Sequence, residues 1–141
     1  MSRPSIVVAD APNEADRDAI LRALIAYNDA AGGPSGFHPV AVLVQDPDTG
    51  ETCGGLWGRI VYDWLLIELL AIPEAMRHQH LGSDLLARAE DVARARNCAG
   101  VWLDTYAFQA PDFYRRHGYE QFGVIDDHPR GGRRFFFKKT L

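Results

Sequence analysis

The stretch from Arg77 to Ser83 joins an apolar segment to a helical one, and its residue types could bind an anion. A helix start presents backbone N–H groups that have no partner within the helix, and the helix dipole adds partial positive charge there. Arg77 adds a full charge, and Gly82 would let the chain approach a ligand closely. The pattern suits a phosphate or pyrophosphate. A simple strand-to-helix connection has the same outline, and the loop alone does not decide between them.

Glu68 is the one carboxylate in the apolar run from Trp64 to Ile72. A charge in such a strand is unfavourable unless it is paired or used. Glu68 is therefore a candidate general base, with an ion pair or an edge-facing charge as the alternatives. Strand alternation predicts that it shares a face with Leu66 and Leu70. A bulge in this strand would change that face.

His78 and His80 form an H-x-H pattern, which raises the question of a metal. A zinc site needs three or four suitable ligands, and neither a Cys pair nor H-E-x-x-H accompanies this pattern. We therefore predict no metal site. The remaining histidines are expected at the surface or in turns: His38, His117 and His128.

Hydrophobic periodicity and turn residues predict the elements that would position these side chains. Strands are expected over residues 6–9, 40–45, 52–60, 64–72, 100–105, 119–125 and 133–139, and helices over 13–31, 82–97 and 110–117. The first helix carries an apolar face that should pack on something: Ile20, Leu21, Leu24 and Ile25. The order β-α-βββ-α-β-α-ββ indicates a single α+β domain over residues 1–141, with a mixed, mostly antiparallel sheet.

Composition narrows the functional class. The 141 residues are 47% hydrophobic and 24% charged, with a net charge of -4, which is ordinary for a globular chain and argues against a nucleic-acid binder. No apolar run approaches the roughly 20 residues of a membrane helix. Cys53 and Cys98 fall in no C-x-x-C pair and are expected to be free thiols. We expect a soluble, cytoplasmic protein with no membrane or nucleic-acid partner.

Two segments carry a family resemblance. The string Arg77-His78-Gln79-His80-Leu81-Gly82 resembles the R/Q-x-x-G-x-G/A signature of the GNAT superfamily of N-acetyltransferases. The segment from Ala110 to Tyr119 resembles that family's A-x-x-F-Y-x-x-x-G-F/Y pattern. The predicted order of elements is also the order of GNAT domains, so the resemblance extends over nearly the whole chain.

The resemblance implies acetyl-CoA as cosubstrate, in the gap between the strand ending at Ile72 and the strand over 101–105. Pantetheine would pair with backbone groups of Leu70 and Ile72. The pyrophosphate would lie on the loop and helix start, which comprise Arg77, His78, Gln79, His80, Leu81, Gly82 and Ser83. The reaction implied is direct acetyl transfer to a primary amine of a small molecule or peptide.

By the same resemblance, Tyr114 is the proton donor to the leaving thiolate, because a phenol is protonated at pH 7. Glu68 would be the base that deprotonates the amine, through water. Read without the family, Phe113 and Tyr114 could simply be core aromatics. The alternative function is a CoA-binding regulatory or partner-binding module without turnover. A homodimer through Phe135–Phe137 and burial of these rings in the core are both left open.

The chain departs from the family pattern at two positions. His80 stands where the signature has its first glycine, which a histidine tolerates if its φ stays negative, and its imidazole would then lie near the phosphates. Ala107 replaces a frequent asparagine, so a side-chain contact to pantetheine is expected to be lost.

Overall fold

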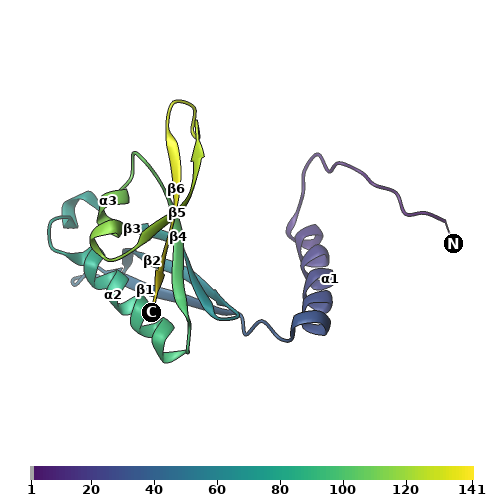
Figure 1. The fold of residues 1–141 in the computed structure, drawn as a ribbon, viewed down its shortest axis with the longest axis horizontal. Coiled ribbons are helices and arrows are strands. Elements are labelled where there is room, and N and C mark those ends of the chain that lie inside the picture. The colour runs from purple at the N-terminus through teal and green to yellow at the C-terminus, as the bar shows by residue number, and fades with distance from the viewer. Residues whose placement is uncertain (1) are drawn as a thin grey trace. The chain divides into compact units, whose positions relative to one another are not determined.

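The computed structural model describes residues 2–141 and divides the chain into two compact units, one ending at Ser35 and one spanning Gly36–Leu141 (Figure 1). The elements in chain order are α1 (Glu14–Gly32), β1 (His38–Gln45), β2 (Thr52–Val61), β3 (Trp64–Ala71), the 3-10 turn η1 (Glu74–Met76), α2 (Leu81–Ala95), β4 (Gly100–Tyr106), α3 (Pro111–Arg116), β5 (Glu120–Asp126) and β6 (Arg133–Thr140). No helix within residues 2–141 is long and apolar enough to cross a membrane.

The first unit contains one helix, α1. Its start is fixed by a capping box, in which the Asn13 side chain accepts from the Asp16 backbone N–H at 2.9 Å and the Asp16 carboxylate accepts from the Asn13 N–H. The predicted strand over residues 6–9 is absent, because no other strand of this unit is available to pair with it. Within this unit the apolar face of α1 has no second helix or strand to pack against, and no residue of α1 is buried.

The second unit is built on a six-stranded sheet in the order β1-β2-β3-β4-β6-β5. Every neighbouring pair is antiparallel except β3 and β4, which run parallel. The predicted fold class, a mixed and mostly antiparallel α+β sheet, is therefore confirmed. The order of elements from α1 onward is also as predicted.

Helices α2 and α3 both contribute to one core on one face of this sheet (Figure 1). The core consists of Leu85 and Leu86 of α2, Tyr114 of α3, and alternate strand residues such as Leu65 and Phe137. Alternation exposes the intervening strand residues on the opposite face, which we call the outer face; it carries Trp57, Arg59, Leu66, Trp102 and Asp104. Burial thus accounts for Phe137 without a second copy of the chain.

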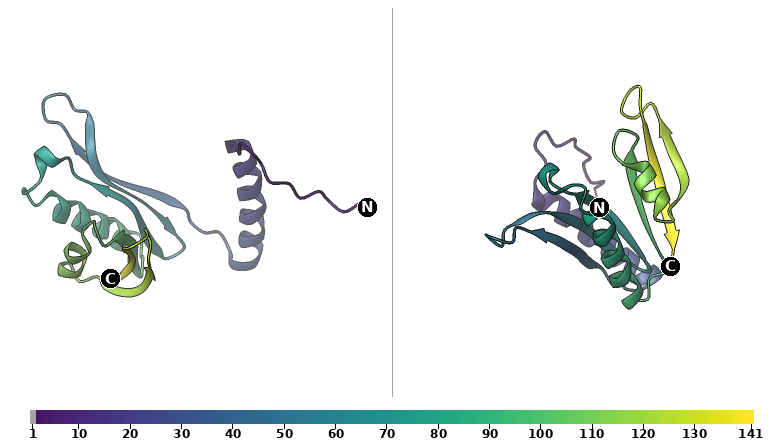
Figure 2. Two further views of the ribbon diagram at one scale, coloured as in Figure 1. Left: turned by 90° about the horizontal axis from the view of Figure 1, so that it is seen from above. Right: turned by 90° about the vertical axis from the view of Figure 1, so that its left-hand side faces the viewer.

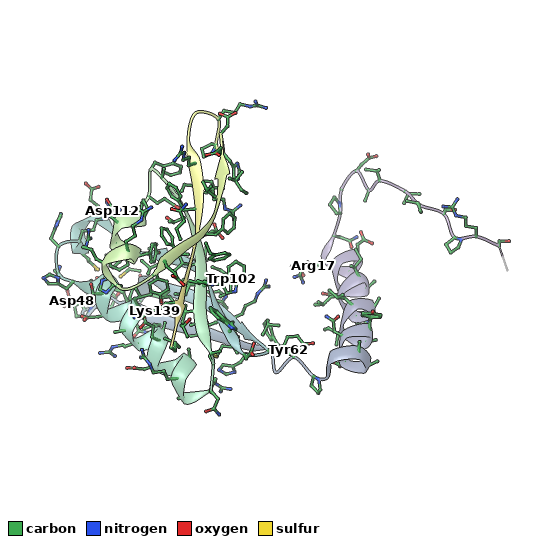
Figure 3. All side chains as sticks on the ribbon, viewed as in Figure 1. Arg17, Asp48, Tyr62, Trp102, Asp112 and Lys139 are labelled. Carbon is green, nitrogen blue, oxygen red and sulfur yellow. The ribbon has the colours of Figure 1, made fainter. Side chains whose placement is uncertain are left out.

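A buried polar cluster joins α2 to β6 and to the residue that precedes β5. Glu90 is 5% exposed, and its carboxylate accepts from the Tyr119 hydroxyl at 3.0 Å and from Lys139 Nζ at 2.8 Å. Lys139 is labelled on β6 in Figure 3. Because a buried charge is tolerated only when it is paired, these three groups hold one another in place.

Candidate functional site

A cleft opens where the two central strands part. β3 and β4 pair only from Trp64 with Gly100 to Ile67 with Leu103, although β3 continues to Ala71 and β4 to Tyr106. The right-hand view of Figure 2 shows β1–β3 and the β5–β6 hairpin diverging. A cavity of about 1050 Å³ lies here, lined by both strand ends, the loop before α2, the start of α2, and α3. Its volume is at the upper end of the range for small-molecule sites.

One end of the cleft is formed by the loop and helix start that the sequence singled out. All of the predicted cofactor-binding residues line it except Gln79: Leu70, Ile72, Arg77, His78, His80, Leu81, Gly82 and Ser83. The first intrahelical bond of α2 runs from the Asp84 N–H to the His80 carbonyl, so the amides of Leu81, Gly82 and Ser83 lie ahead of the ladder. The arrangement can hold an anion on backbone donors.

Two close contacts tie this loop to its surroundings. The Arg77 Nε donates to the Ile72 carbonyl at 3.2 Å, which closes the loop on the end of β3. A Cβ at Gly82 would lie 3.3 Å from the Phe113 ring, so the glycine lets the start of α2 pack closely against α3. Gly82 therefore has a packing role here in addition to the ligand approach predicted from the sequence.

His80 departs from the expected backbone conformation. Its φ is 59°, and that of His78 is 66°, so both residues are left-handed. The condition that φ stays negative at His80 is therefore not met: the residue lies in the left-handed region, which favours glycine. Histidine enters this region more readily than most residues, yet it is less favourable there than glycine.

We expect His80→Gly to stabilise the protein by about 0.5–1 kcal/mol, because relief of the left-handed conformation exceeds the entropy that glycine adds to the unfolded chain. Urea unfolding monitored by circular dichroism measures the difference. Gln79→Gly is the matched control, since Gln79 is outside the left-handed region and should lose stability. Equal losses in both variants would contradict strain at His80.

His117, which was expected at the surface or in a turn, lies in the turn after α3 and contacts the start of α2. Its Nε2 lies 3.0 Å from Ser83 Oγ, and its ring lies 4.7 Å from the Phe113 ring. The contact joins residues 34 positions apart, so no local pattern could have indicated it. His117 orients the Ser83 hydroxyl at the start of α2.

Tyr114 lines the cleft from α3 while most of its ring lies in the core. It is 8% exposed, against the rings of Tyr119 and Phe137. Burial, and then the nearby Asp104 carboxylate, raise the pKa of Tyr114 to about 12. The hydroxyl is therefore a proton donor, and not a base, at any physiological pH. Tyr114 is a core aromatic that also borders the cleft, and its role as proton donor stays a prediction.

The two buried tyrosines make stability depend on alkaline pH. The pKa of Tyr119 is also raised, by burial and then by Glu90. Above about pH 10 an unfolded tyrosine loses its proton while these two keep theirs, so the unfolded state binds fewer protons. We expect the free energy of unfolding to fall from about pH 10 to pH 12, by up to about 1.4 kcal/mol per pH unit for each tyrosine. Urea titrations at stepped pH measure the slope, and Tyr114→Phe should make it shallower; constant stability would contradict the prediction.

Glu68 lies at a bulge that changes the face of the residues after it. Glu68 shares the outer face with Leu66, as alternation predicted, because both lie beside Arg59. Trp57 pairs with Leu69 and Gly58 with Ile67, so Glu68 has no partner across the β2–β3 ladder. Leu70 packs on the core, whereas Glu68 lies beside Arg59, 3.4 Å from its Nε. The expectation that Glu68 and Leu70 share a face was therefore wrong, because the extra residue shifts the alternation. Glu68 lines the cleft and also makes the ion pair considered as its alternative role.

A second carboxylate faces the cleft from β4. Asp104 accepts from Arg134 Nε and Nη2, both at 2.8 Å. No local pattern could indicate this pair, because its two residues are 30 positions apart. Each carboxylate that lines the cleft beyond the parting of the strands thus has an arginine beside it.

Among residues 2–141 no group of three or more His, Cys, Asp or Glu side chains is arranged to hold a metal ion. Cys53 is exposed, and Cys98 is buried; both are free. The groups that line the cleft can bind an anion through backbone amides, donate a proton from a phenol and accept a proton on a carboxylate.

Several known proteins are similar to this chain in sequence or in fold. The family model described as the Acetyltransferase (GNAT) family matches residues 9–119. Acetyltransferase Atu2258 of Agrobacterium fabrum is 37% identical over 121 residues, which cover 86% of this chain and 88% of that protein. Blasticidin-S acetyltransferase of Streptomyces morookaense is 45% identical over 87 residues, 60% of this chain and 62% of the relative. A crystal structure of an Agrobacterium tumefaciens protein superposes with a TM-score of 0.92 at 33% identity, covering 98% of this chain and all of that one.

Proposed function

The chain belongs to the GNAT family of acetyltransferases, and we propose that it transfers the acetyl group of acetyl-CoA directly to a primary amine of a small molecule or peptide. The observation that carries the proposal is the junction of three features on one cleft: parted parallel strands, a helix start with free amides, and a buried tyrosine. The family match runs across the division after Ser35, which supports one catalytic domain over the whole chain.

In this proposal the cosubstrate is held mainly by backbone. The pyrophosphate lies on the amides of the loop and of the first turn of α2, with Ser83 at its edge and His117 behind Ser83. Pantetheine amides pair with Leu70 and Ile72, where β3 has left its partner strand β4. The loss of an asparagine side chain at Ala107 leaves these backbone contacts intact.

The proposed reaction involves three proton transfers within the site and the release of one proton to solvent. Glu68, through water, accepts a proton from the ammonium of the acceptor, because only the free amine is a nucleophile. The amine nitrogen attacks the thioester carbonyl, a C–N bond forms, and a backbone N–H in the Leu70–Ile72 segment stabilises the oxyanion. The C–S bond then breaks, and the Tyr114 hydroxyl gives its proton to the thiolate. The attacking nitrogen then loses its second proton to the phenolate, which restores the phenol, and Glu68 releases its proton to solvent.

For the acceptor, two findings favour a small molecule recognised by shape more than by charge. A relative 45% identical over 87 residues is named for acetylation of blasticidin S. The two cleft carboxylates are neutralised by Arg59 and Arg134, so the cleft offers little net attraction to a cation. Salt should therefore change acceptor affinity only slightly.

The deciding experiment is release of free CoA thiol from acetyl-CoA in the presence of a panel of acceptors. The panel contains blasticidin S, polyamines, aminoglycosides, amino acids, arylalkylamines and peptides. Acceptor-dependent release, with an acetylated product found by mass spectrometry, is the expected result. Silence across the panel, together with a rise in melting temperature on CoA addition, would favour the CoA-binding module without turnover. Silence without such a rise would overturn CoA binding as well.

A further inference from the structure

Phe108 is an apolar ring held out at the cleft. It is 73% exposed and lines the cavity. One of its faces stacks on Tyr106, with ring centroids 5.4 Å apart and planes within 6° of parallel. The other face is open to solvent at the cleft, so it is free to stack with a second ring.

The turn that presents Phe108 is tightly bonded. Gln109 Oε1 accepts from the Tyr106 N–H at 2.8 Å and from the Thr105 hydroxyl at 3.1 Å. The Gln109 N–H donates to the Tyr106 carbonyl at 2.9 Å, and the Ala107 N–H donates to the Arg133 carbonyl at 2.9 Å. The ring is therefore mounted on a fixed turn rather than on a mobile loop, and a rigid surface binds a ligand with less loss of entropy.

The partner of Phe108 in the stack is itself braced from the β5–β6 hairpin. The His128 ring meets Tyr106 edge-on at 5.4 Å, and the Arg134 guanidinium lies 5.5 Å from the Tyr106 ring centroid. These contacts lie on the outer face, because Tyr106 is on the same side of β4 as Trp102 and Asp104. Trp102 is labelled in Figure 3. Asp104 and Phe108 both line the cleft, so a carboxylate and an aromatic platform border the same space.

We propose that the acceptor carries a planar conjugated ring, which stacks on the open face of Phe108 while its amine lies among Glu68, Asp104 and the thioester. The inference rests on the proposed acetyl transfer and adds the class of acceptor: an amine on an aromatic or heteroaromatic scaffold. A platform of stacked rings with one face free selects flat π-systems over puckered rings of equal size.

The test compares two amines that differ only in the ring: 2-phenylethylamine, which is flat, and 2-cyclohexylethylamine, which is puckered and more apolar. Both are measured by calorimetry for binding to the CoA-saturated protein and by thiol release for acetyl transfer. We expect the flat ring to be preferred by about two- to tenfold, the factor that a stacked aromatic pair contributes beyond buried area. Phe108→Leu should bring the preference close to one, and Phe108→Trp should restore it.

Phe122→Leu is the matched control, because Phe122 is also an exposed phenylalanine, 51% exposed on β5, and is not among the residues lining the cleft. It should keep the preference for the flat ring. Absence of a preference in the unaltered protein overturns the inference, as does a Phe108→Leu variant whose only change is a weaker affinity for acetyl-CoA, which would assign the ring to the cosubstrate. Preference in binding without transfer to any amine would contradict the proposed reaction while keeping the aromatic subsite.

Discussion

Replacing Tyr114 with phenylalanine is expected to lower kcat by about 10²-fold or more, while the KM for acetyl-CoA changes less than about twofold. Only the hydroxyl is removed, so the ring keeps its place between Tyr119 and Phe137. The thiolate would then leave without a proton donor. Steady-state kinetics with the best acceptor of the panel measures both constants.

The pH profile gives a second test of Tyr114. Because its pKa is about 12, the hydroxyl keeps its proton throughout the usable range, so kcat should show no decline from this residue below about pH 11. Tyr119→Phe is the control: it removes a buried hydroxyl that bonds Glu90 and should lower stability without a comparable loss of kcat. Similar kcat losses in both variants would indicate a packing effect rather than proton donation.

Glu68→Gln is expected to lower kcat/KM for the amine by about 10²-fold at neutral pH, because the amide cannot accept the proton of the ammonium. The shape of the side chain is kept, and Gln can still bond to Arg59. The measurement is the initial rate of thiol release at subsaturating acceptor, across a range of pH. The loss should shrink at high pH, where more of the acceptor is already the free amine.

Two further variants separate base catalysis from the ion pair. Arg59→Gln removes the partner of Glu68 and should change the rate only a few-fold if the carboxylate acts as a base. Glu120→Gln, on the exposed part of β5, controls for the loss of a negative charge. A rate loss in Arg59→Gln as large as that in Glu68→Gln would show that the ion pair, and not the base, is what the site requires.

The sequence allowed every α-helix and strand of the second unit to be predicted, because each has its own periodicity and its own end signals, whereas the 3-10 turn η1 was not predicted. Leu85, Leu86 and Ala89 mark the buried side of α2, and Gly118 follows α3. The prediction of a strand over residues 6–9 was wrong. An apolar segment becomes a strand only if it finds a partner to pair with, and local sequence does not show whether it does.

The parts of the site that depend on a local motif could be predicted from the sequence. The parts that depend on strand register or on contacts between distant residues could not. The loop before α2 and Tyr114 both border the cleft, as the motifs indicated. Glu68 and Leu70 lie on different faces because of a one-residue bulge against β2, which alternation cannot reveal. The contacts of His117 with Ser83 and of Arg134 with Asp104 join residues 30 or more positions apart. Such pairs arise from the fold and leave no local pattern.

The four-pair ladder between β3 and β4 is the only strand pairing that joins the two halves of the described sheet. Beyond Ile67 and Leu103 each strand has backbone groups facing a gap, so a pantetheine chain paired there would act as a short surrogate strand. Binding of the ligand would then be coupled to the rigidity of the sheet. In amide hydrogen exchange, an empty cleft would be the place where the sheet opens first, and a filled one would be protected along the length of the bound arm.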